Sequence, residues 1–153
     1  MKDHYKNLFK YESWANNEIA VSLSANVEIP AKAVSLMSHI INAQMIWLSR
    51  MQNVSSEIKV WQEYGKDELT YKLKISSEKL AGFLNSLSEN DLNKVISYAN
   101  TKGEKFETIL SDILIHMSHH SAYHRGQIIT LIKPFVSELP YTDYIHFIRI
   151  IKK

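Results

Sequence analysis

The sequence predicts an antiparallel four-helix bundle, because helical spacing of apolar residues recurs along the chain and residues that break helices are few. The chain has 153 residues, with only four Gly and three Pro, so long helices can run without interruption. It is 45% hydrophobic and 22% charged, which suits one globular domain with its own core. We therefore expect a single all-α domain over residues 1–153.

Four segments have apolar residues at spacings of three and four, the period that places side chains on one face of a helix. These segments cover residues 8–23, 36–51, 69–87 and 108–131. A polar stretch over 52–67 separates the second segment from the third and is expected to form a long loop. Helices of this length bury their apolar stripes by packing together as a bundle.

Two smaller elements are predicted on either side of the fourth helix. Residues 92–106 lose the helical period, and a turn signal over 100–103 makes a small hairpin possible before that helix. Pro134 ends the fourth helix because proline has no N–H for the helical ladder. Pro140 and Thr142 then introduce a short last helix. Its apolar residues are Ile145, Phe147, Ile148 and Ile151. A bundle this short with such a patch is expected to form a homodimer.

The composition excludes several classes of protein. The chain has no Cys, which excludes a disulfide scaffold, a Cys-ligated zinc finger and an iron–sulfur protein. The net charge is +2 and no basic block is present, so no nucleic-acid partner is expected. Residues 1–14 are polar where a secretion signal needs an apolar stretch, and no uncharged apolar run could span a bilayer. We therefore expect a cytoplasmic protein that does not bind a membrane.

Three histidines lie in the apolar stripe of the fourth helix, each four residues from the next: His116, His120 and His124. That spacing stacks the three side chains on one face. A buried imidazole needs partners for both ring nitrogens. A metal ion binds one nitrogen while the other donates a hydrogen bond. The spacing therefore favours a metal site over a set of histidines that are simply hydrogen-bonded in the core.

A tetrahedral ion needs a third ligand from elsewhere in the chain, and His39 on the second helix is the natural choice. One helical turn rises about 5.4 Å, so one ion can bind His116 with His120, or His120 with His124, but not all three. The spacing leaves both pairs open. The remaining histidines fit this site less well: His4, His119 and His146.

Motifs of other metal and catalytic sites are absent from the sequence. The chain has no Glu-x-x-His pairs for a di-iron bundle, no H-E-x-x-H, no Gly-rich phosphate loop and no G-x-S-x-G. Imidazole ligands suit several transition metals. We expect one divalent metal per chain, zinc or nickel in the first place, with iron, manganese or copper as alternatives.

Three segments of the chain resemble a known family. Residues 120–127 read HSAYHRGQ, residues 36–50 read LMSHIINAQMIWLSR, and residues 139–148 read LPYTDYIHFI. They are similar to the corresponding segments of the DinB/YfiT-like metalloprotein superfamily, whose members are four-helix bundles. The resemblance implies His39, His120 and His124 as the metal ligands and places His116 outside the triad. The chain departs from the family at Gln44, where relatives often have an acidic residue.

The resemblance also implies an activity. Some members of this superfamily are thiol-dependent transferases or isomerases, in which the metal binds the thiolate of a small cofactor such as bacillithiol or mycothiol. The chain is therefore expected to act on a small molecule as a metal-dependent S-transferase with a low-molecular-weight thiol. Three protein ligands and an open position are typical of catalytic metal sites. A metal-dependent hydrolase and a non-catalytic, metal-stabilised protein of the stress response are the alternatives.

Further residues near the expected ligands are candidates for the reaction. His116 is either a general base near the open position or a core histidine hydrogen-bonded to the third helix. Tyr123 is either a proton donor or a packing residue. Arg125 either binds an anionic group of the substrate or pairs with a carboxylate on a neighbouring helix. Gln127 lies one turn beyond His124 and can orient that ligand.

Overall fold

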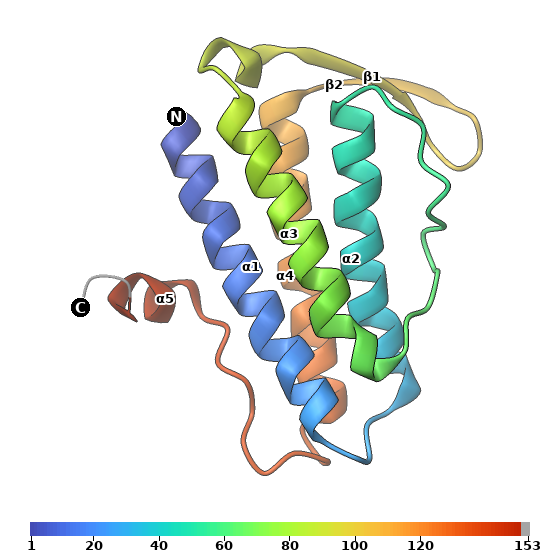
Figure 1. The fold of residues 1–153 in the computed structure, drawn as a ribbon, viewed down its shortest axis with the longest axis vertical. Coiled ribbons are helices and arrows are strands. Elements are labelled where there is room, and N and C mark those ends of the chain that lie inside the picture. The colour runs from blue at the N-terminus through green and yellow to red at the C-terminus, as the bar shows by residue number, and fades with distance from the viewer. Residues whose placement is uncertain (151–153) are drawn as a thin grey trace.

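The computed structural model describes residues 1–150, in which four long helices lie side by side (Figure 1). These are α1 (Lys2–Ala25), α2 (Ala31–Met51), α3 (Leu69–Ser86) and α4 (Leu110–Ile132). The smaller elements are the 3₁₀ turns η1 (Lys66–Glu68) and η2 (Asn90–Asn93), the strands β1 (Val95–Ala99) and β2 (Lys105–Ile109), and the helix α5 (Tyr144–Ile150). The expected last helix is thus present, although Ile151 lies outside the described residues.

The fold differs from a simple antiparallel bundle because α2 and α3, which follow each other in the chain, run in the same direction. α1 and α4 run one way along the bundle, and α2 and α3 both run the other way (Figure 1). α1 packs against α3 and α2 against α4 as antiparallel pairs, whereas α2 and α3 are parallel neighbours. The connection over 52–65 therefore crosses the length of the bundle, and we call it the crossover loop. Extended, a segment of this length reaches about 45 Å, more than the roughly 31 Å of a helix of 21 residues such as α2.

The end of α2 explains where the crossover loop begins. Asn53 has a φ of +55°, the left-handed conformation that Asn tolerates better than most residues. The backbone N–H of Val54 donates to Ser49 O at 3.0 Å, and that of Asn53 to Arg50 O at 3.1 Å. These two bonds form a Schellman motif, which satisfies the last carbonyls and turns the chain out of the helix.

The predicted hairpin is present, so the fold is mostly helical with a small antiparallel sheet rather than strictly all-α. β1 pairs with β2 from Val95 opposite Ile109 to Ala99 opposite Lys105. Gly103 in the turn has a φ of +82°, which glycine adopts without steric cost. α4 begins at Leu110 instead of Thr108 because Thr108 and Ile109 pair with β1.

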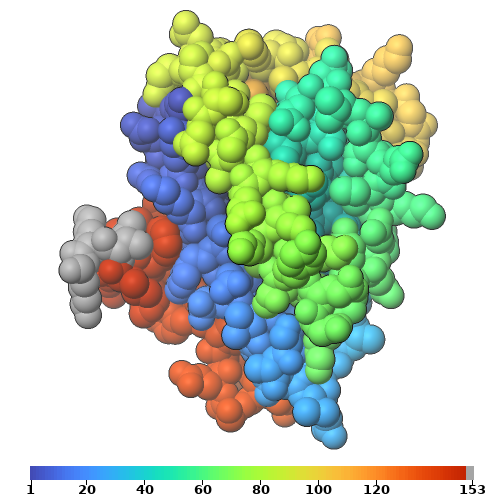
Figure 2. All heavy atoms as spheres, viewed as in Figure 1, coloured from blue at the N-terminus to red at the C-terminus, as the bar shows by residue number. Residues whose placement is uncertain are grey.

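The interior of the bundle consists of two apolar clusters with a polar layer between them. One cluster surrounds Phe9, Leu84 and Leu114, and the other surrounds Ile19, Ile41 and Ile128. Between them, each long helix contributes buried polar side chains: Glu12, Asn16, His39, Asn42, Ser76, Ser118, Ser121 and Arg125. The hairpin covers one end of the bundle and α5 packs on α1 (Figure 2).

Among the helices within residues 1–150, none has the length and hydropathy of a membrane span. The polar layer between the two clusters contains His39, so it is the part of the bundle where a functional site is expected.

Candidate metal centre

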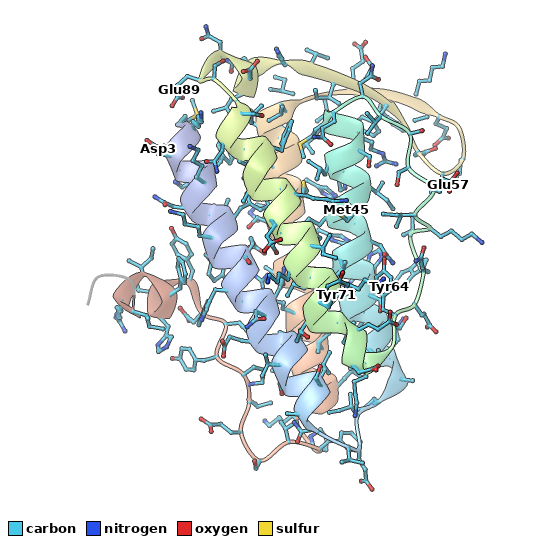
Figure 3. All side chains as sticks on the ribbon, viewed as in Figure 1. Asp3, Met45, Glu57, Tyr64, Tyr71 and Glu89 are labelled. Atoms are coloured by element: carbon cyan, nitrogen blue, oxygen red, sulfur yellow. The ribbon has the colours of Figure 1, made fainter. Side chains whose placement is uncertain are left out.

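The crossover loop is attached to α2 next to His39. The amide of Asn42, which is fully buried, donates to Gln62 O at 2.7 Å. Tyr64, at the end of the loop (Figure 3), donates from its hydroxyl to Asn42 Oδ1 at 2.7 Å. The backbone N–H of Tyr64 donates to Ser38 Oγ at 3.1 Å. These bonds fix the loop segment around residue 60 beside the predicted ligand.

The structure brings His39, His120 and His124 together. Their possible ligand atoms all lie within 4.8 Å of one another, with Nε2 of His39 3.0 Å from Nε2 of His120. The ring centroids of His124 lie 4.8 Å from His39 and 4.5 Å from His120. α2 and α4 pack side by side, which explains why residues 81 positions apart meet.

Two of these imidazoles are oriented by hydrogen bonds on their outer nitrogens. Nδ1 of His39 lies 3.1 Å from Val60 O, and Nδ1 of His124 lies 2.7 Å from Oε1 of Gln127. A carbonyl oxygen only accepts, so each Nδ1 carries the proton and each Nε2 keeps its lone pair. This is the arrangement that protein ligands adopt around a metal, and it agrees with the expectation for Gln127.

The protonation of the ligands also favours metal binding. Burial in the first place, and the neighbouring His124, His39 and His116 in addition, lower the pKa of His120 to about 4. Burial also lowers the pKa of His39, although its bond to Val60 opposes this effect. Both imidazoles are therefore neutral at pH 7, and a neutral imidazole is the form that binds a metal.

The three residues fit one transition-metal ion. Two nitrogens bound tetrahedrally at 2.0–2.1 Å lie about 3.3 Å apart, close to the 3.0 Å between the Nε2 atoms of His39 and His120. A direct hydrogen bond between these nitrogens would need a proton on one of them, whereas an ion between them uses both lone pairs. The three-His group can therefore hold a metal ion with three nitrogen ligands.

Aromatic side chains border the group on its solvent side. The Trp61 ring stacks on His39, with centroids 4.1 Å apart and an angle of 12° between the planes. Trp61 is 54% exposed and Tyr123 is 65% exposed. The Tyr123 ring lies edge-on to His124 at 5.1 Å. Each of these rings therefore presents exposed apolar surface next to a predicted ligand.

His116 lies beside the triad but not in it. Its ring centroid is 5.8 Å from that of His120 and 5.3 Å from the ring of Trp47. The side chain is exposed, so the alternative of a core histidine is wrong. The part of the ring that packs on its neighbours is still desolvated, which lowers the pKa of His116.

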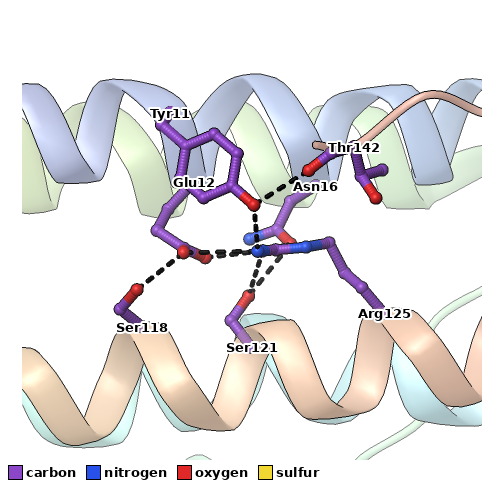
Figure 4. Close-up of polar contacts among 7 residues, drawn as sticks. All are labelled: Tyr11, Glu12, Asn16, Ser118, Ser121, Arg125 and Thr142. Carbon is purple, nitrogen blue, oxygen red and sulfur yellow. Dashed lines mark hydrogen bonds and ion pairs between the residues drawn. The ribbon is translucent and has the colours of Figure 1, made fainter. Parts of the chain in front are cut away.

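Arg125 faces α1 rather than the histidines (Figure 4). Its guanidinium donates to Glu12 Oε2 at 2.5 Å, to Asn16 Oδ1 at 2.9 Å and to Ser121 Oγ at 2.8 Å. A further bond reaches the hydroxyl of Tyr11 at 3.2 Å. Arg125 and Glu12 are each 2% exposed. The placement agrees with the ion pair to a neighbouring helix, and these partners occupy the donors that an anionic substrate would need.

Sequence reasoning missed the residues that the crossover loop brings to the site. Val60 and Trp61 contact His39, but neither belongs to a periodic pattern that indicates a partner. Asn42 was a detectable signal, because an amide on the apolar side of a helix needs hydrogen-bond partners. Gln44, the position at which the chain departs from the family, lies five residues after His39 on α2. Its Nε2 donates to Ser76 Oγ on α3 at 3.4 Å.

Comparison with known proteins gives an independent finding on the whole chain. The family model described as "DinB family" matches residues 1–152. Protein DinB of Bacillus subtilis (strain 168) is 26% identical over 162 aligned residues, which cover 94% of this chain and 93% of that protein. No solved structure matches the chain.

Proposed function

Because the chain belongs to the DinB family, we propose that it binds one divalent transition metal through His39, His120 and His124 and acts as a metal-dependent S-transferase with a low-molecular-weight thiol. The convergence of three imidazole nitrogens within 4.8 Å carries this proposal. Nitrogen ligands of this kind suit zinc or nickel in the first place. Three protein ligands leave one coordination position for a small molecule, as in catalytic sites.

The ion in this site would supply Lewis-acid chemistry, which lowers the pKa of a thiol in the open position. Residues of the chain would orient the metal ligands and transfer the protons. Val60 O and Gln127 hold His39 and His124 in the ligating tautomer. His116, with its lowered pKa, is neutral at pH 7 and can accept the thiol proton. The Tyr123 hydroxyl can donate a proton to the leaving group.

Two features of the chain favour a thiol over water as the reactant. The protein has no Cys of its own, so no internal thiolate competes for the open position. The exposed rings of Trp61 and Tyr123 offer apolar surface to an organic thiol. A free thiol persists in a reducing compartment, so we place the reaction in the cytoplasm. A hydrolase and a non-catalytic stress-response protein would use the same metal group, and the experiment below separates them.

Cobalt substitution tests the proposal. The protein loaded with Co²⁺ is titrated with 2-mercaptoethanol while the near-ultraviolet spectrum is recorded. We expect a thiolate charge-transfer band that saturates at one thiol per cobalt, and no stoichiometric cobalt in His39→Ala. His4→Ala is the matched control, because His4 lies at the far end of α1 and should keep both the metal and the band. A loaded protein whose spectrum does not respond to thiol would contradict the transferase and favour the hydrolase or the non-catalytic protein.

A further inference from the structure

A groove of about 750 Å³ lies between α2, the crossover loop and the end of β1. Its apolar lining includes Ile46 and Ile58. At one end it is lined by Val60 and Trp61, the same two residues that bond to and stack on His39. The three histidines do not line the groove, so these two residues lie between it and His39.

The charges along this groove are unbalanced. Its lining has two cationic side chains, Arg50 and Lys59, and no carboxylate. Glu57, on the same stretch of the crossover loop (Figure 3), is exposed and does not line the groove. Two other grooves lie along α1 and α3, and there lysines share the lining with Asp3 or Glu78. One of those grooves is balanced in charge, with two lysines against Asp3 and Glu78, and the other has two lysines against Glu78 alone. The groove beside the metal centre differs from both because its two cations face no carboxylate in the lining.

The Arg50 guanidinium is oriented by its neighbours but is not paired with a carboxylate among residues 1–150. Its guanidinium carbon lies 4.5 Å from the ring centre of Trp47 and 5.0 Å from that of Tyr98. One of its nitrogens donates to Ala99 O at 3.1 Å. Among residues 1–150 no carboxylate pairs with it within 4 Å, although the side chain is half-buried. An arginine has five donors in a planar fork, so this oriented guanidinium keeps donors for a bound group.

We propose that this groove binds a small organic carboxylate, with Arg50 on the carboxylate, Lys59 as a second cation and the apolar lining against the body of the ligand. The proposal rests on the proposed function in one respect: the other end of the ligand, at Trp61, is the thiol that reaches the histidines. Arg50 and His39 are eleven positions apart on α2, about 16 Å along the helix axis. The substrate class is therefore an elongated thiol that ends in a carboxylate.

The groove itself can be tested without metal. The indole N–H signal of Trp61, assigned with a Trp61→Phe variant, is followed by NMR while the metal-free protein is titrated with octanoate or with octanol. We expect octanoate to bind about tenfold more tightly, as a charge-assisted hydrogen bond allows. Arg50→Gln should remove this preference, and Lys59→Gln, on the exposed loop, should reduce it by about half to two-thirds. Equal binding of the two probes, or a preference that persists in Arg50→Gln, would overturn the proposal.

The link to the metal centre is tested on the cobalt-loaded protein with 11-mercaptoundecanoate, 11-mercaptoundecanol and 3-mercaptopropionate. The charge-transfer band should reach half-saturation at about tenfold lower concentration for the long acid than for the long alcohol. Arg50→Gln should abolish this difference, and Arg149→Gln, which removes a charge from exposed α5, should not. The short acid should be insensitive to Arg50→Gln. Equal midpoints for the two long thiols would overturn the shared ligand, whereas no band with any thiol would contradict the proposed function and leave the octanoate result to decide the groove.

Discussion

Replacing Arg125 with methionine should destabilise the protein strongly while the metal ligands stay in place. Methionine keeps an unbranched apolar side chain but removes the guanidinium that bonds to Glu12, Asn16, Ser121 and Tyr11. The Glu12 carboxylate is 2% exposed. In the variant it would keep only the hydroxyl of Ser118 as a donor, at 2.8 Å. The change therefore leaves a buried negative charge without its cation.

The size of the effect follows from this burial. Removal of one partner from a buried ion pair costs about 3–5 kcal/mol of unfolding free energy, a large part of the roughly 5–15 kcal/mol that stabilises a domain. The double variant Glu12→Gln/Arg125→Met removes both charges, so it should recover about 1–3 kcal/mol relative to Arg125→Met.

Urea unfolding of the metal-free protein at pH 7, followed by circular dichroism, measures these free energies. Arg149→Met on exposed α5 is the matched control and should change the stability by less than about 0.5 kcal/mol. Metal content of the folded Arg125→Met protein should remain at one ion per chain, because the guanidinium faces α1. A loss below about 1 kcal/mol, or a double variant no more stable than the single one, would refute the reasoning.

Three further predictions concern the histidines and the assembly. His124→Ala should lose stoichiometric metal and His116→Ala should keep it, as measured by elemental analysis after gel filtration; loss of metal in both would shift the ligand pair by one helical turn. Burial holds the pKa of His120 at about 4, below the 6.5 of an unfolded chain. The unfolded state therefore binds a proton first, and the metal-free protein should lose stability as the pH falls from 6.5 to 4; a His120→Gln variant with the same urea profile would contradict this. We also predict a homodimer through α5, where Ile145 is 51% exposed. Sedimentation at micromolar concentration should show twice the 17.7 kDa mass, and Ile145→Lys should dissociate it; a single 17.7 kDa species for the unchanged protein would reject the dimer.

Local patterns predicted the elements of this fold well. The period of three and four indicated all four long helices, because each must bury one apolar stripe. The loss of that period and the turn signal over 100–103 indicated the hairpin. The start of α4 was placed two residues too early, since Thr108 and Ile109 also fit a helical stripe. Their pairing with β1 is a contact between strands that a helical pattern does not contain.

The metal ligands were predicted by two different signals. Spacing indicated the histidine stripe of α4 but left His116 equal to His124, and the resemblance over residues 120–127 favoured His124. The structure brings His39, His120 and His124 together and places His116 at the edge of the group. For Arg125 the sequence offered an ion pair without naming its partner, because the choice of Glu12 depends on which face of α1 meets α4.

The sequence by itself thus determined the helices, the hairpin and the histidine stripe of α4, because these follow from periods and spacings within short segments. The choice of His124 over His116 followed from the resemblance over residues 120–127 and not from spacing. Tertiary structure alone decided the direction of α3 and the environment of the site. The crossover loop is long enough to reach either end of the bundle, so its course depends on bonds such as those of Asn42 to Gln62 and Tyr64. That course places Val60 and Trp61 on His39 and opens the groove that leads to Arg50. Contacts between residues so far apart in the chain form only when the whole bundle is packed, and no local pattern encodes them.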